Sequence, residues 1–285
     1  ARRDQKWREV TYRKVVAALK AMPFKICSVA DLDRPEAAAL AGGHTRVRVQ
    51  EFLQRGSIEL ARRVQEDPRA NMISELMNFG MHTGKGKKYP SYVGFSTAER
   101  WFESGITCME ELQRRVESQP GFLTHNQQVM WDFRADFAQR IPRAEVELIA
   151  DVVRAAFPSA ASVEVCGSFR RGAPNCGDVD LLVCAVGDLG RLLERGVDRL
   201  TADGFLTSTL RDPQRTAVAA ESGGQWQGGC RLASLTGLAA RPEHMAHTLH
   251  RRLDIKVYPL KHRAFAQLYF GSGEVFNRVI RLFAT

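Results

Sequence analysis

Apolar positions along the chain follow two different periods. Through the first 64 residues they recur at helical spacing, and the first such run stops before Pro23. Strand-like runs appear later. Residues 163–166 alternate between apolar and polar, and residues 179–186 are almost continuously apolar, which is typical of a buried strand. The pattern therefore predicts a helical amino-terminal part followed by a part that contains a sheet.

The sheet-containing part has further predicted elements. Residues 145–157 and 189–200 have the apolar spacing of amphipathic helices, and residues 225–232 read as a strand. The segment 233–250 is predicted as a surface loop with a short helix. In the strand that follows it, Leu253, Ile255 and Val257 lie on one face, and Asp254 and Lys256 lie on the other.

Residues 167–180, Gly-Ser-Phe-Arg-Arg-Gly-Ala-Pro-Asn-Cys-Gly-Asp-Val-Asp, hold the strongest chemical signal. On a strand, Asp178 and Asp180 point to the same face, where two carboxylates can bridge a hard cation such as Mg²⁺. The backbone N–H groups near Gly167 and Ser168 are accessible to phosphates. Asp254, on a later strand, is the candidate third carboxylate. A solvated turn is the alternative reading of the bare Asp-x-Asp pair.

Composition adds an anionic partner. The net charge is +9 and the pI is near 9.5, which favours nucleic acid, although a basic soluble protein needs no such partner. The six cysteines lack metal-binding spacing, and most of them are predicted to be reduced core residues of an intracellular protein. No stretch reaches transmembrane length. The histidines at 244, 247, 250 and 262 are interpreted as surface residues rather than metal ligands.

Several of these motifs together resemble the family X DNA polymerases. Gly167–Gly172 and Gly177–Asp180 match the palm signature of that family, and Arg251–Asp254 resembles the strand that carries its third carboxylate. The segment Tyr269–Asn277 resembles its nucleotide-binding segment. The similarity extends from Tyr12 to Arg281 in the family's order.

The resemblance implies a multidomain α/β fold: two small helical helix-hairpin-helix domains followed by a mixed-sheet nucleotidyltransferase palm. The implied boundaries are 1–64 for a lyase-like domain, 65–142 for a DNA-binding domain, 143–262 for the palm and 263–285 for the start of a nucleotide-selection subdomain. The family continues beyond that point, so either the sequence is truncated there or the protein has lost part of that subdomain.

The resemblance also implies residue roles. Asp178, Asp180 and Asp254 are the implied catalytic carboxylates, which hold two Mg²⁺ ions, with Mn²⁺ as a possible substitute. Arg140 and Arg171 are implied to bind the dNTP phosphates. The implied backbone cradle and nucleotide-lining residues are Gly167, Ser168, Gly177, Tyr269, Phe270, Glu274, Asn277 and Arg281.

The sequence departs from the family at several positions. The lysine nucleophile of the 5′-deoxyribose-phosphate lyase falls on Arg48, and an auxiliary lysine falls on Arg8. Arginine stays protonated and cannot form the imine, so lyase activity is predicted to be lost, with Lys14 and Lys25 as unfavoured substitutes. Cys176 replaces a serine of the phosphate cradle, the order Gly271-Ser272-Gly273 is altered, and residues 82–90 read as an inserted basic loop.

The expected function is filling of short gaps in gapped or nicked DNA during base-excision-type repair. We expect a monomer in the nucleus or the mitochondrion, with no membrane association and with unknown repair partners. Two alternatives stay open: a non-catalytic nucleic-acid-binding or assembly protein that keeps the polymerase fold, and a nucleotidyltransferase acting on RNA.

Overall fold

The structure is a computed structural model that describes residues 12, 14–40, 42–81, 90–212, 224–237 and 240–283. It forms two compact units, Ala1–Met72 and Ile73–Thr285. Residues 82–89 of the predicted basic loop (82–90) and the auxiliary position Arg8 lie outside the described residues. Among the helices that are described, none is long and apolar enough to cross a membrane.

The first unit is helical, as predicted. Residues 14–20 are helical and are followed by the short 3₁₀ helices η1 (Val29–Asp33) and η2 (Pro35–Leu40), and then by α2 (Gly43–Arg55) and α3 (Glu59–Glu66). The helix α2 ends at Gly56, whose φ of 68° is the left-handed conformation that glycine adopts without strain.

Helices also form the start of the second unit. They are α4 (Pro68–Leu76, which begins in the first unit), α5 (Phe95–Glu103), α6 (Met109–Ser118), α7 (His125–Asp132) and α8 (Arg134–Phe137). A capping box formed by Thr124 and Gln127 begins α7. The rings of Phe79 and Trp131 pack edge to face, with 5.3 Å between their centroids, and this contact joins the segment after α4 to α7.

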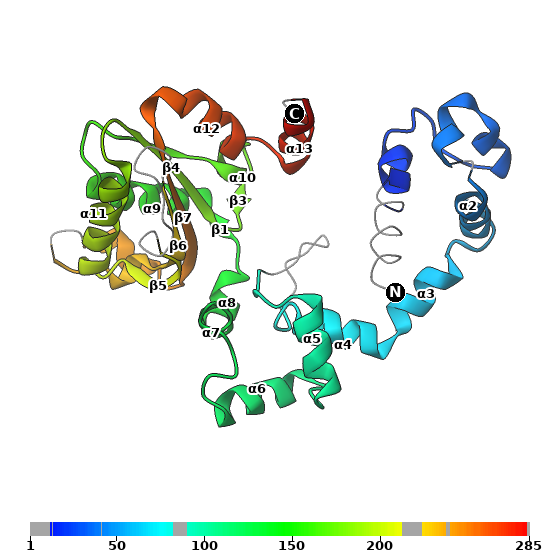
Figure 1. The fold of residues 1–285 in the computed structure, drawn as a ribbon, viewed down its shortest axis with the longest axis horizontal. Coiled ribbons are helices and arrows are strands. Elements are labelled where there is room, and N and C mark those ends of the chain that lie inside the picture. Colours follow the sequence, from blue (N-terminus) through cyan, green and yellow to red (C-terminus); the bar gives the residue numbers. More distant parts are fainter. Residues whose placement is uncertain are drawn as a thin grey trace. The chain divides into compact units, whose positions relative to one another are not determined.

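A five-stranded mixed sheet forms the rest of the second unit (Figure 1). Its order is β2-β4-β7-β6-β5; β4 and β7 are parallel and the other neighbours are antiparallel. The strands are β2 (Ser162–Val165), β4 (Val179–Ala185), β5 (Leu206–Arg211), β6 (Gly224–Cys230) and β7 (Arg251–Pro259), with β1 (Ile141–Pro142) paired to β3 (Asn175–Cys176) apart from them. The accompanying helices are α9 (Arg143–Ala156), α10 (Gly167–Arg170), η4 (Leu232–Ser234), η6 (Pro242–Ala246), η7 (Leu260–His262), α11 (Leu189–Ala202), α12 (Arg263–Gly271) and α13 (Glu274–Phe283).

The two faces of this sheet differ in chemistry. On one face, Leu181 pairs with Ile255 and Val183 with Val257, and all four are buried in the main core with residues of α9 and α11. On the other face, Leu182 and Cys184 pack with Ala266 of α12. Since neighbouring residues of a strand face opposite sides, Asp180 and Asp254 share this second face with α12.

Two sequence-based interpretations need correction. The strand β5 was not predicted, because its sequence Leu-Thr-Ser-Thr-Leu-Arg has little apolar alternation. The histidines at 244 and 250 are not surface residues. His244 is 3% exposed, and its Nδ1 accepts a hydrogen bond from the backbone N–H of Arg241. Nδ1 of His250 lies 2.9 Å from Oδ2 of Asp136, a partner 114 residues away that no local pattern reveals.

Candidate active site

Two of the three predicted carboxylates are direct neighbours. Asp180 of β4 is paired in register with Asp254 of β7 across the parallel strands, so both project from the same level of the sheet. Asp178 lies immediately before the first residue of β4 rather than within the strand. The parallel pairing of two strands far apart in sequence therefore assembles most of the carboxylate centre.

Two basic side chains offset part of the negative charge of the three carboxylates. Arg252 lies 3.3 Å from Asp178, and Nζ of Lys256 lies 3.2 Å from Oδ1 of Asp180 and 4.0 Å from Oδ2 of Asp254. The same Nζ lies 4.5 Å from the centre of the Phe270 ring, a cation–π contact. Within the described part of the chain, no three His, Cys, Asp or Glu side chains are gathered closely enough to hold a metal ion.

Burial makes the carboxyl groups of Asp180 and Asp254 costly to ionise. Asp254 is buried, and this burial, reinforced by the charge of Asp180, raises its pKa to about 6. Burial also raises the pKa of Asp180, with the charge of Asp178 adding to the effect. Nε2 of Gln227, on β6, donates a 3.1 Å hydrogen bond to Oδ2 of Asp254. Asp180 and Asp254 therefore lose their protons readily only when nearby positive charge stabilises the carboxylates.

The start of the 167–180 motif packs against the carboxylates. Gly167 has a φ of 57°, and a Cβ atom at that position would overlap Oδ2 of Asp180. Arg143 holds the following turn: its guanidinium stacks on Phe169 and donates to the carbonyl oxygens of Phe169 and Ala173. Ser168 lies in this turn, within α10. The fold thus brings the glycine-serine backbone to the predicted metal ligands.

Both predicted phosphate-binding arginines lie at the edges of this centre. Arg140 donates to the side-chain and backbone oxygens of Asn175 at 2.8 and 2.7 Å, and its Nη1 lies so near Gly177 that a Cβ there would approach to 2.9 Å. Arg171 donates to the carbonyl oxygens of Gly271 and Ser272 at 3.3 and 3.4 Å. Arg171 therefore links the motif to the end of α12.

The predicted nucleotide-lining residues gather on α12 and α13. Tyr269 and Phe270 pack edge to face with 4.9 Å between ring centroids. Asn277 donates to the carbonyl oxygen of Tyr269 at 2.7 Å, and Arg281 lies 5.7 Å from the Tyr269 ring centre. Glu274 begins α13, and its side chain lies outside the described set.

The type of donor, but not its present spacing, suits a hard divalent cation. Three carboxylates supply the oxygen ligands that Mg²⁺ prefers, and to hold an ion they would have to draw closer together than they lie in the described residues. Sequence reasoning did not assign roles to Arg252, Lys256 or Gln227. The only indication for Lys256 was its place on the same strand face as Asp254. Gln227 contacts Asp254 because of the β6–β7 register, which the sequence alone does not fix.

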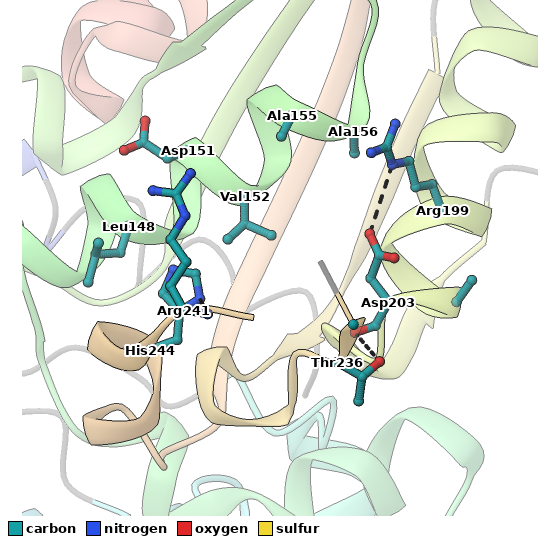
Figure 2. Close-up of a pocket in the computed structure, with 12 residues that line it drawn as sticks. Leu148, Asp151, Val152, Ala155, Ala156, Arg199, Asp203, Thr236, Arg241 and His244 are labelled. Carbon is teal, nitrogen blue, oxygen red and sulfur yellow. Dashed lines mark hydrogen bonds and ion pairs between the residues drawn. The ribbon is translucent and has the colours of Figure 1, made fainter. Parts of the chain in front are cut away.

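A cavity of about 530 Å³ lies apart from this centre, beside α9 and α11. Figure 2 shows its lining from α9, α11 and the segment before and within η6, with an ion pair between Arg199 and Asp203. Asp203 also accepts a hydrogen bond, through its carbonyl oxygen, from Thr236. None of the predicted site residues lines this cavity, so it is separate from the carboxylate centre.

Comparison with known proteins accounts for this arrangement. Residues 140–260 match the model of the DNA polymerase beta palm. The chain is 31% identical to DNA polymerase lambda of Rattus norvegicus, 28% to DNA polymerase lambda of Arabidopsis thaliana and 27% to DNA-directed DNA/RNA polymerase mu of Homo sapiens, over 97–98% of its own length. The chain spans about half the length of these relatives: 43%, 48% and 56% of their chains, respectively. The chain is therefore similar to family X DNA polymerases over nearly its whole length, and residues 140–260 carry the match to their palm.

Proposed function

We propose that this protein is a DNA-directed DNA polymerase that adds deoxynucleotides to the primer end of gapped or nicked DNA in repair. The observation that carries the proposal is the in-register pairing of Asp180 with Asp254, with Asp178 beside them and the Gly167 backbone against Asp180. Nucleotidyl transfer needs a carboxylate centre of this kind next to phosphate-binding groups.

The phosphate-binding groups support the same function. The guanidinium groups of Arg140 and Arg171 are suited to bidentate contact with the β- and γ-phosphates of a dNTP. Both arginines bind backbone or amide oxygens in the structure, so these contacts hold them near the motif. We infer that Tyr269, Phe270, Asn277, Glu274 and Arg281 line the sugar and base of the incoming nucleotide.

The carboxylates carry the proton chemistry in this proposal. Burial raises the pKa of Asp254 to about 6 in the metal-free protein. In this proposal the Asp254 carboxylate accepts the proton of the primer 3′-hydroxyl. Asp178, Asp180 and Asp254 would hold Mg²⁺, with Mn²⁺ as a possible substitute. Bound Mg²⁺ supplies positive charge that stabilises the transferring phosphoryl group. Lys256 and Arg252 balance the same carboxylates through their own ion pairs.

The test is extension on a duplex with a one-nucleotide gap, with labelled dNTPs and Mg²⁺. Template-directed addition of one nucleotide supports the proposal. Tight DNA binding without extension, in Mg²⁺ and in Mn²⁺, supports instead the non-catalytic assembly protein. Extension of RNA but not of the gapped DNA supports the RNA nucleotidyltransferase.

DNA contact is assigned to the helical part of the second unit. We propose that the turn before α5 works as a helix-hairpin-helix element, in which backbone N–H groups from Gly94 onward bind a DNA phosphate. Gly94 is the N-cap of α5, and glycine has no side chain that could cap the first N–H groups of the helix in place of a phosphate. We also propose a monomeric protein in the nucleus; no observation supports the mitochondrion.

Gly167→Ala is expected to lower nucleotide addition by about a hundredfold, the scale of losing roughly 3 kcal/mol of transition-state stabilisation. The new methyl group would push the Asp180 carboxylate from its position, and the left-handed φ of 57° would be strained by any side chain. Single-turnover extension of the gapped duplex measures the effect.

Gly172→Ala is the matched control for that prediction. Gly172 has a φ of 77° in the same turn, but no atom lies within 4 Å of the position of its Cβ. It should share the backbone strain, about 1 kcal/mol of stability, and keep most of the activity. Equal activity losses in the two variants would show that strain, not the Asp180 contact, is responsible.

We propose that lyase activity is absent because Arg48 occupies the nucleophile position. Arg48 stacks over Tyr12 at 4.9 Å from the ring centre and donates a hydrogen bond to its hydroxyl. Both residues line an apolar cavity of about 580 Å³, which Lys25 also borders. A guanidinium in this place can bind a phosphate but cannot attack the sugar aldehyde.

Borohydride trapping on 5′-incised abasic DNA tests this prediction. The natural protein should give no covalent adduct, and Arg48→Lys should introduce one, because a lysine within an apolar cavity has the lowered pKa that imine formation needs. An adduct with the unaltered protein would refute the prediction. Its loss in Lys25→Ala, but not in Lys14→Ala, would then identify the substitute nucleophile.

A further inference from the structure

One side chain outside the predicted site contacts a catalytic carboxylate directly. Gln227 of β6 is paired with Asp254 of β7 across the antiparallel strands, and its Nε2 donates to Oδ2 of Asp254 at 3.1 Å. Residues directly opposite on antiparallel strands project to the same face. The register that buries Trp226 in the core therefore also turns Gln227 toward the carboxylate centre.

A carboxylate at this position needs an external partner to fix its orientation. The terminal torsion of an aspartate is soft, so the strand backbone sets where the Asp254 carboxyl lies but not how it is rotated. Lys256 is a weak candidate for that role, because its Nζ is 4.0 Å from Asp254 and is shared with Asp180 and the Phe270 ring. Gln227 makes the shorter contact and comes from a different strand.

An amide suits this role for a second reason. It donates a hydrogen bond without adding charge, so it orients Asp254 while leaving the charge balance of Asp178, Asp180, Arg252 and Lys256 unchanged. In the described residues, the hydrogen bond to Asp254 from another side chain goes to Oδ2. Oδ1 is thereby left for the metal ion and the primer end.

We propose that Gln227 is a positioning residue that fixes the rotation of the Asp254 carboxylate for metal binding and primer attack. The inference rests on the proposed function, since it assigns Asp254 the metal-binding role argued above. Partners that orient metal ligands in this way typically change metal affinity or activity by about 10–100-fold when removed.

The test compares two variants that lack the donor with a matched control. Gln227→Met keeps the length of the side chain, and Gln227→Glu keeps its shape but replaces the N–H donor with a charged acceptor. Gln225→Met is the control. Gln225 is on the same strand and the same face, but it is paired with Lys256 and its Oε1 accepts from Arg211 at 3.3 Å.

Two readouts are needed. Single-turnover extension should show the maximal rate of nucleotide addition lowered about tenfold in both Gln227 variants. The dNTP concentration that gives half of that rate should stay within about twofold of the original in Gln227→Met. Electron paramagnetic resonance titration with Mn²⁺ uses protein bound to gapped DNA with a dideoxy-terminated primer. It should show Mn²⁺ affinity weakened about tenfold in Gln227→Met and unchanged in Gln225→Met.

Three outcomes would overturn the inference. They are an unchanged Mn²⁺ affinity in Gln227→Met, an unchanged rate of nucleotide addition in both Gln227 variants, or a loss of rate and Mn²⁺ affinity in Gln225→Met as large as in Gln227→Met. The Mn²⁺ titration needs no turnover, so it tests Gln227 even if the unaltered protein extends no primer. In that case the proposed function fails independently. Thermal unfolding of each variant identifies any loss that comes from misfolding.

Discussion

Asp254→Asn is expected to lower nucleotide addition by about a thousandfold, the effect of losing roughly 4 kcal/mol of transition-state stabilisation. The substitution preserves the shape of a buried side chain and a hydrogen bond with Gln227, but it removes the negative charge and the proton acceptor. Affinity for gapped DNA should change little, because the helical part that is proposed to contact DNA is untouched. Extension assays and fluorescence anisotropy measure the two quantities.

The same variant should be more stable than the original protein in the absence of metal. Burial raises the pKa of Asp254 from 3.8 to about 6, so ionising it costs the folded state on the order of 3 kcal/mol relative to the unfolded chain. For a carboxyl with a raised folded pKa, the unfolded chain loses its proton first. Stability therefore falls as the pH rises from about 4 to about 6, and the loss persists above that range.

Urea unfolding with EDTA between pH 4 and pH 8 measures this difference. The advantage of Asp254→Asn over the original protein should be small near pH 4 and grow to its full size by about pH 7. Asp151→Asn, on the exposed part of α9, is the control for neutralising a carboxylate outside the core. An active Asp254→Asn, or a variant that is less stable at pH 7, would contradict the assignment.

Arg251→Met is expected to lower the free energy of unfolding by about 3–5 kcal/mol. The Arg251 guanidinium donates to both carboxylate oxygens of Glu145 at 2.7 and 2.8 Å, and both side chains are buried. Removing the arginine leaves the Glu145 charge without its main partner in the core. Since this pair joins α9 to the first residue of β7, its loss loosens the strand that carries Asp254.

The double variant Arg251→Met/Glu145→Met should recover most of the lost stability, because no buried charge then lacks a partner. Arg241→Met is the matched control. Arg241 pairs with Glu243 at 3.8 Å at the surface, where an ion pair contributes at most about 1 kcal/mol. Chemical denaturation followed by circular dichroism measures all three variants. A loss below about 1 kcal/mol in Arg251→Met would show that the pair is dispensable.

The sequence predicted those features of the site that depend on local pattern. The alternation in β7 put Leu253, Ile255 and Val257 on the core face and Asp254 on the other, and the strand pairing confirms this placement. The helices α9 and α11 were predicted to within about two residues, because an amphipathic stripe is visible over a few turns.

Most of the features that the sequence did not predict depend on partners distant in the chain. Arg252 and Lys256 lie beside Asp178 and Asp180, which come much earlier in the chain, and His250 lies beside Asp136. The strand β5 is held by its pairing with β6 rather than by an apolar pattern of its own. Tertiary contacts outweigh local preference at these positions, so a single sequence cannot reveal them.

The parallel pairing of β4 with β7 also has a consequence for how the chain matures. Asp180 contacts Lys256, which lies 76 residues later in the chain. The sheet is complete only when β6, which lies between β7 and β5, has also paired. Parallel strands this far apart close slowly, because a long loop is ordered before the contacts form. During synthesis, the chain therefore carries Asp178 and Asp180 as an incomplete half-centre until β7 emerges. Competence for catalysis should consequently be among the last properties that the folding palm acquires.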